Sequence, residues 1–395
     1  MLRNERFILC FCLGAFFFIS VQLISSSDVI NNIKILANST ATPSYVAKKR
    51  QRICILAGPH KTGTSSIQAN LYSWSKATIN FTDSMFSPLP EPVISWIWPV
   101  PIQIARIEHN DSHTWDWSPS KVFYPMMEVL MDKNRHPEQR SLFQMYTPDE
   151  IVKMYQEAIS TYWNDGYDIV FGTEAMDMIV KLKEGPSMIR NISTHILPDI
   201  DGDQVTVVVM YRAPKVKHLI SMWHQNCVKP TDDKFYEWIT TTHNTLGPMD
   251  SLGMVDMFLN ETNWNVALVN LEGLKEHDWD VSNFVACKIL GEECKNKVLK
   301  DLHGSEPIVT NVRSGKRSPN VPNETLVEID VILNQFDCNY KHILKGDNPR
   351  LKLFYPEGLR ERYDSCLKVE DEYPKSRTAM IEQMKAIAIK GGKLW

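Results

Sequence analysis

The chain contains the stretch Arg52-Ile-Cys-Ile-Leu-Ala-Gly-Pro-His-Lys-Thr-Gly-Thr-Ser-Ser-Ile-Gln68. The apolar run 53–57 predicts a buried strand, and the glycine- and hydroxyl-rich turn after it leads into a helix expected at 64–74. A turn of this kind aims successive backbone N–H groups and a helix N-terminus into one concavity. The stretch therefore predicts a binding site for a phosphate-like anion.

The loop matches only part of the pattern G-x-x-x-x-G-K-[ST] of nucleoside-triphosphate-binding P-loops. Gly58, Gly63 and Ser65 are in place, but Thr64 stands where that pattern has its lysine, and the lysine here is Lys61, inside the loop. A nucleoside-triphosphate hydrolase is therefore disfavoured. The arrangement x-x-K-[TSG]-G-[TS]-[TS] resembles the 5′-phosphosulfate loop of sulfotransferases that use 3′-phosphoadenosine 5′-phosphosulfate (PAPS).

A second segment, residues 203–223, resembles another element of that family. A β-branched run at 205–211 is followed by Arg212, by a proline two residues later and by a helix expected at 215–225. In sulfotransferases such an element grips the 3′-phosphate of PAPS with an arginine and a serine, and the matching positions here are Arg212 and Ser221. The two are nine residues apart here, whereas the family spacing is usually eight.

The order of the two segments predicts the architecture. Further strands are expected at 168–171 and 266–270, and further helices at 148–162, 281–290 and 324–336, which is the alternation typical of an α/β fold. We expect a P-loop-like central parallel sheet flanked by helices on both faces. Because loops at the carboxyl ends of parallel strands converge on one crevice, two anion-binding turns about 150 residues apart can hold the two ends of one nucleotide.

The resemblance assigns roles to the loop residues. Lys61 both binds PAPS and stabilises the charge that develops on the bridging oxygen to the nucleotide, where preorganised donors act most strongly. Backbone N–H groups and hydroxyls around the 5′-phosphosulfate come from Thr62, Gly63, Thr64, Ser65 and Ser66. A late basic loop adds Lys316 and Arg317 as nucleotide contacts. No metal is required, because a lysine and a helix N-terminus already supply positive charge.

Two residues are candidates for the base that deprotonates the acceptor. Glu174 is the first choice, because it follows the strand expected at 168–171 and the element Gly172-Thr173-Glu174 is similar to a Ser-Ser-Glu element of carbohydrate sulfotransferases. An alternative role for Glu174 is to order the loop around Lys61. His60 is the rival base, since imidazole has the better unperturbed pKa.

Length and composition agree with an enzyme. A chain of 395 residues with 43% hydrophobic content can bury the core of one large domain or two. The net charge of −4 gives no support to nucleic-acid binding, which favours a basic excess. A stretch rich in tryptophan and proline before residue 148 is interpreted as an insertion near the substrate mouth.

The N-terminus predicts a membrane anchor. Arg3 and Arg6 precede an uncharged run of 18 residues at 7–24, which is long enough to cross a bilayer core and favours a lumenal location for the rest of the chain. A cleaved signal peptide is the alternative. We expect a cytoplasmic tip and signal anchor at 1–24, a stem at 25–49 and a lumenal catalytic domain at 50–395, in the Golgi membrane.

Glycosylation and cysteine patterns agree with the secretory pathway. Six Asn-x-Ser/Thr sites lie beyond the anchor, at Asn38, Asn80, Asn110, Asn191, Asn260 and Asn323. In an oxidising lumen, Cys287 with Cys294 and Cys338 with Cys366 are candidate disulfides, with connectivity left open. Cys54 lies in an apolar strand and is expected to be a buried small hydrophobe.

Together these features resemble membrane-bound carbohydrate sulfotransferases. The expected function is transfer of a sulfuryl group from PAPS to an acceptor hydroxyl, on a glycan first, with tyrosine or a lipid-like alcohol as other acceptors. Two alternatives stay open. One is a P-loop phosphotransferase, and the other is a non-catalytic glycan-binding relative, since a fold alone does not define an activity.

Overall fold

The computed structural model describes residues 50–58, 67–68, 70–71, 96–97, 99, 126–127, 129, 145–172, 174–197, 200–226, 232–241, 250–290, 321–369 and 373–390. Apart from Arg50, these residues belong to one compact unit, Gln51–Trp395. The predicted anchor and stem lie outside the described residues. Within the described part, no helix is both long and apolar enough to cross a bilayer.

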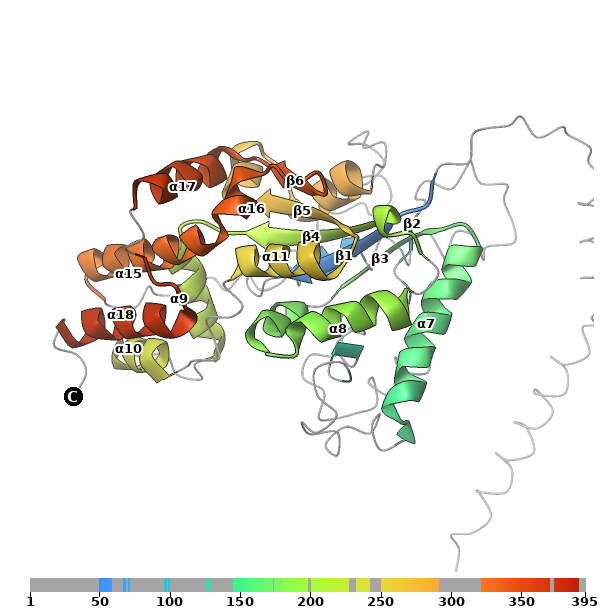
Figure 1. Cartoon of the computed structure of the whole chain (residues 1–395), viewed down its shortest axis with the longest axis horizontal. Helices are drawn as coiled ribbons and strands as arrows, with labels where there is room; N and C mark the ends of the chain where they lie inside the picture. Colours follow the sequence, from blue (N-terminus) through green and yellow to red (C-terminus); the bar gives the residue numbers. More distant parts are fainter. Residues whose placement is uncertain are drawn as a thin grey trace, which may run out of the picture. The chain divides into compact units, whose positions relative to one another are not determined.

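A parallel β-sheet forms the centre of this unit (Figure 1). Its six strands within the described residues run in the order β2-β3-β1-β4-β5-β6, and every neighbouring pair is parallel. The strands are β1 (Ile53–Gly58), β2 (Trp96–Ile97), β3 (Asp168–Gly172), β4 (Val205–Tyr211), β5 (Asn265–Asn270) and β6 (Leu351–Phe354). The fold is therefore α/β, with β1 between β3 and β4.

The central strands are apolar on both faces. All residues of β1 and β3 are buried, and six of the seven residues of β4 are buried as well. A parallel sheet covered by helices requires this pattern, and it explains why these strands read as continuous apolar runs in the sequence.

Helices flank the sheet. Helix α7 (Pro148–Asn164) begins at a capping box in which the Thr147 side chain accepts from the Glu150 N–H and the Glu150 carboxylate accepts from the Thr147 N–H. The other α-helices are α8 (Gly185–Asn191), α9 (Lys215–Asn226), α10 (Asp232–Thr241), α11 (Ser251–Glu261), α12 (Leu271–Glu276), α13 (Val281–Phe284), α15 (Asn323–Phe336), α16 (Lys341–Lys345), α17 (Glu357–Lys368) and α18 (Arg377–Lys390). Helices α7, α11, α12 and α13 begin at a residue whose side chain caps the helix.

The described residues also contain shorter helical segments. The 3₁₀ segments are η3 (Glu174–Lys181), η5 (Gly202–Gln204) and η8 (Asp337–Tyr340), and the π segments are η4 (Ile192–Ile196) and η7 (Val285–Ile289). The helix expected at 281–290 is thus divided into α13 and η7.

Buried apolar side chains form two clusters. The larger cluster surrounds the sheet. The smaller one lies among α9, α10, α15 and α18, with Trp223, Phe235 and Met384 at its centre. Helix α9 belongs to this smaller cluster and also continues directly from β4, so it connects the helical cluster to the carboxyl edge of the sheet.

The structure tests several predictions. The four expected strands are present with ends that differ by at most one residue. The sequence prediction omitted β2, which falls inside the tryptophan-rich insertion, and β6. Cys338 and Cys366 form a disulfide, and Cys54 is free and buried, as expected. Cys287 is disulfide-bonded too, but its expected partner Cys294 lies outside the described residues.

Candidate functional site

The carboxyl end of β1 leads into the predicted anion loop. Gly58 closes the strand with φ 104°, a left-handed conformation that favours glycine, and the register with β4 shifts between Leu56 and Gly58. The residues predicted to bind the 5′-phosphosulfate follow at once but lie outside the described residues: Lys61, Thr62, Gly63, Thr64, Ser65 and Ser66. His60, the alternative base, lies outside them as well. Their roles remain predictions.

The carboxyl end of β4 lies beside that of β1. Gly58 pairs with Val209, and β4 ends two residues later at Tyr211, immediately before Arg212. From β1 the chain moves towards β2 on one side of the sheet, whereas from β4 it moves to β5 on the other side. Such a reversal is a topological switch point, where open α/β sheets bind their ligands. The expected parallel sheet is confirmed, and within it β1 and β4 are direct neighbours.

Arg212 is half-buried and interacts electrostatically with the carboxylate of Glu272. Burial lowers the pKa of the Arg212 guanidinium, while the carboxylate of Glu272 acts in the opposite direction. Glu272 is in α12, whose N-terminus follows β5 and is capped by the side chain of Asn270. Asn270 pairs with Tyr211 across the sheet. Glu272 also accepts from the Lys275 ammonium at 2.9 Å, so charges of both signs lie at the carboxyl edge of β4 and β5.

The other predicted site residues are spread over three segments. Glu174 begins η3 directly after β3, the neighbour of β1, so its backbone lies at the same edge of the sheet; its side chain is outside the description. Ser221 is partly exposed and lies six residues into α9, about 9 Å along the axis from Lys215. Lys316 and Arg317 lie outside the described residues.

A buried polar cluster that sequence reasoning missed holds the Arg212 turn. The Tyr211 hydroxyl donates to Asp337 Oδ2 over 3.0 Å, and the Lys215 ammonium donates to Asp337 Oδ1. All three residues are buried. In the sequence, only the position of Lys215, three residues after Arg212, pointed to this cluster. Asp337 is more than 120 residues away, and nothing in its sequence neighbourhood indicated the contact.

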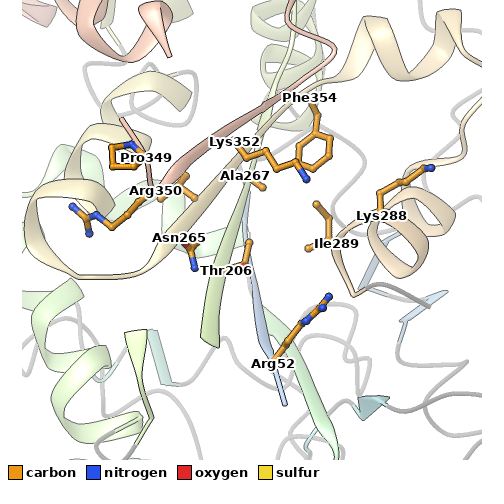
Figure 2. A pocket seen from close by; sticks show the side chains of 11 residues that line it. Arg52, Thr206, Asn265, Ala267, Lys288, Ile289, Pro349, Arg350, Lys352 and Phe354 are labelled. Carbon is orange, nitrogen blue, oxygen red and sulfur yellow. The ribbon is translucent and has the colours of Figure 1, made fainter. Parts of the chain in front are cut away.

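A cavity of about 300 Å³ lies at the opposite edge of the sheet. Arg52, Asn265 and Arg350 line it where β1, β5 and β6 begin, and Thr206, Lys288 and Lys352 line it as well (Figure 2). The described residues that line it include four cationic side chains and no carboxylate. The cavity is separated from the Arg212 turn by the length of the strands, which is about 20 Å for β1.

The four cations of this cavity already have partners. The Arg350 guanidinium donates to the carbonyl oxygens of Thr262 and Leu259. Lys352 and Lys288 lie over the rings of Phe354 and Trp279, at 4.7 and 5.3 Å. Arg52 Nη1 donates to the Leu290 carbonyl oxygen at 3.5 Å. In Figure 2 the ends of Arg350 and Lys288 point away from each other. We therefore place the candidate site at the Arg212 edge.

Comparisons of the chain with protein-family models, with curated proteins and with solved structures found no match. Among the described residues, no group of three or more His, Cys, Asp or Glu side chains is arranged to hold a metal ion. The functional argument therefore rests on the chain itself.

Proposed function

We propose that the protein is a PAPS-dependent sulfotransferase that transfers a sulfuryl group to an acceptor hydroxyl, most suitably on a glycan. The observation that carries the proposal is the parallel pairing of β1 with β4 at the switch point of the sheet. This pairing brings the start of the Lys61 loop next to the turn that carries Arg212. A nucleotide with phosphates at both its 5′ and 3′ positions has two anionic ends for two such turns.

The chemistry that we propose is a single in-line displacement. The acceptor oxygen attacks sulfur and loses its proton to a base, while the bond between sulfur and the 5′-phosphate oxygen breaks and adenosine 3′,5′-bisphosphate leaves. Lys61 stabilises the charge on the leaving oxygen. Glu174, which follows the strand next to β1, is the proposed base, and His60 is the alternative.

Secretory features support a lumenal location for this reaction. The predicted glycosylation asparagines within the described residues, Asn191, Asn260 and Asn323, are all exposed. The Cys338–Cys366 disulfide is typical of an oxidising compartment. We therefore propose a type II protein of the Golgi membrane.

A phosphotransferase is the second candidate, because Glu174 after β3 is placed where a magnesium ligand of a P-loop enzyme could stand. Thr64 in the lysine position of the P-loop pattern argues against it. The two reactions differ in their donor, since a phosphotransferase requires a nucleoside triphosphate and Mg²⁺.

Transfer of radiolabelled sulfate from PAPS to a panel of desulfated glycans tests the proposal with the full-length protein. We expect transfer by the wild type and loss of transfer in Lys61→Ala. Lys153→Ala is the matched control, because Lys153 is an exposed lysine of α7. If a folded protein neither transfers sulfate nor binds adenosine 3′,5′-bisphosphate, the proposal is wrong; phosphoryl transfer from ATP would favour the second candidate.

A further inference from the structure

We propose that Asp337 is a positioning residue for the 3′-phosphate end of the nucleotide site. This inference rests on the proposed function, because it assigns to Asp337 the task of holding the turn that carries Arg212. Asp337 does this from η8, which follows α15 and is more than 120 residues from the turn in the sequence.

One carboxylate holds both ends of the turn. Oδ2 of Asp337 accepts from the hydroxyl of Tyr211, the last residue of β4, and Oδ1 pairs with the ammonium of Lys215, the first residue of α9. Only Arg212, Ala213 and Pro214 lie between these two anchors. A single side chain therefore contacts the residues on both sides of the turn.

A second carboxylate, from helix α15 just before η8, supports the start of α9. Asp330 Oδ1 accepts from the backbone N–H of Val216 over 2.8 Å, which satisfies one of the N–H groups left unpaired at a helix N-terminus. Helices α15 and α9 pack side by side in the smaller apolar cluster (Figure 1). The turn is thus bound to α15 and η8 by three polar contacts from two carboxylates.

The ion pair between Asp337 and Lys215 is buried. The side chain of Asp337 is 0% exposed and that of Lys215 is 4% exposed. Burial raises the pKa of the Asp337 carboxyl, whereas Lys215 and Arg362 act to lower it. A buried charge requires a partner, so loss of the Asp337 carboxylate removes the ion-pair partner of the buried Lys215 ammonium. The pair therefore holds one arrangement of the turn.

Asp337 is itself held in place from the far side. Cys338, the next residue, is joined to Cys366 of α17, and Arg362 lies one helical turn before Cys366 in the same helix. Arg362 also interacts with Tyr211. The residue next to Asp337 is thus joined covalently to α17, and Arg362 of the same helix acts on both Asp337 and Tyr211.

A positioning role and a merely structural role predict different binding data. Adenosine 3′,5′-bisphosphate has the 3′-phosphate that Arg212 is proposed to bind, and AMP lacks it. If Asp337 positions Arg212, replacing Asp337 weakens binding of the bisphosphate and leaves binding of AMP unchanged. If Asp337 only stabilises the fold, both nucleotides lose affinity together.

The test is calorimetric titration of the full-length protein with both nucleotides. Without Arg212, a charged hydrogen bond is lost, and we expect Arg212→Ala to weaken bisphosphate binding by about ten- to a hundredfold. For Asp337→Asn we expect a loss of about three- to tenfold in the preference for the bisphosphate over AMP. In Asp337→Asn the buried Lys215 ammonium loses its carboxylate partner, and this single variant could fail to fold. The double variant Asp337→Asn with Lys215→Met removes that ammonium, so the same titration can then be made with the double variant.

Asp250→Asn is the matched control. Asp250 is a buried carboxylate that accepts from the Tyr340 hydroxyl at 2.9 Å and pairs with Arg377 at 2.8 Å, but it caps α11 instead of the Arg212 turn. We expect this variant to keep the bisphosphate preference. An unchanged preference in Asp337→Asn and in the double variant, or equal losses for both nucleotides, would overturn the positioning role. A wild-type protein without any preference for the bisphosphate would instead contradict the proposed function.

Discussion

Gly172 of β3 lies directly opposite Leu56 of β1, and this pair sets how closely the two strands approach near the candidate site. A Cβ atom at position 172 would stand 2.2 Å from the Leu56 carbonyl oxygen and 2.7 Å from the Leu56 Cβ. Backbone cannot yield as a flexible side chain does, so only glycine fits. We expect Gly172→Ala to lower the free energy of unfolding by about 1–3 kcal/mol, measured by urea denaturation.

A glycine of the same unit provides the control for this substitution. At Gly358 in α17, the nearest atom to an added Cβ is the side-chain Nδ2 of Asn270, at 3.2 Å. Alanine also has the higher helix propensity. Gly358→Ala is therefore expected to leave the stability almost unchanged. Equal stability of the Gly172→Ala variant and the wild type would contradict the close approach of β3 and β1.

The electrostatic interaction between Glu272 and Arg212 predicts a change in anion affinity. The Glu272 carboxylate stabilises the charged form of Arg212 and competes with any anion that binds there. We expect Glu272→Gln to tighten binding of adenosine 3′,5′-bisphosphate by about two- to fivefold at low salt, with a smaller gain at high salt. Glu276→Gln, at an exposed position at the end of the same helix, is the control. Weaker binding in Glu272→Gln would show that Glu272 supports the site.

The Cys338–Cys366 disulfide is expected to contribute strongly to stability. It closes a segment with a sequence separation of 28 residues. In the chain-entropy description, loss of a link of this size costs about 3–4 kcal/mol. Because Cys287 is also disulfide-bonded, a reductant would act at more than one place. The double replacement of Cys338 and Cys366 by serine isolates this link, and an unchanged denaturation midpoint would contradict its role.

Buried tyrosines predict a loss of stability at alkaline pH. Burial raises the pKa of Tyr211 and of Tyr340, each of which donates to a buried carboxylate. An unfolded tyrosine has a pKa of about 10. Below that pH both tyrosines are protonated in the folded and in the unfolded state, so their ionisation does not lower the free energy of unfolding. Above it, the unfolded state releases protons that the folded state retains, so each tyrosine lowers the free energy of unfolding by about 1.4 kcal/mol per pH unit.

The substitution Tyr211→Phe tests this prediction directly. The variant loses one hydrogen bond and is less stable near neutral pH, but its stability declines less steeply above pH 10 because it has one fewer tyrosine to ionise. Denaturation curves measured at several alkaline pH values give the slope. The same slope in Tyr211→Phe and the wild type would show that Tyr211 ionises normally in the folded protein.

Local patterns in the sequence predicted the centre of the fold and little of its periphery. The strand Val205–Tyr211 was predicted with its observed ends, because a buried parallel strand is a continuous β-branched run. The strand Leu351–Phe354 was missed because it is short, contains an exposed lysine and lies at an edge of the sheet. Such a segment has no pattern that distinguishes it from a loop.

The candidate site, too, was predictable where its residues are close in the sequence and not where they are far apart. Arg212 was found because a strand, a turn and a helix follow one another within one segment. The contact between Lys215 and Asp337 joins residues 122 positions apart. It depends on how α15 packs against α9, which hydrophobic periodicity does not specify. The interaction of Glu272 with Arg212 had no signal in the sequence either, since it is a property of the assembled sheet.

The most direct test of the central claim is a crystal structure of the protein with adenosine 3′,5′-bisphosphate bound. We predict the nucleotide at the carboxyl edge of β1 and β4, with its 5′-phosphate in the Lys61 loop and its 3′-phosphate within hydrogen-bonding distance of the Arg212 guanidinium. A nucleotide bound instead in the cavity that Arg52 and Lys352 line, at the opposite edge of the sheet, would contradict the account.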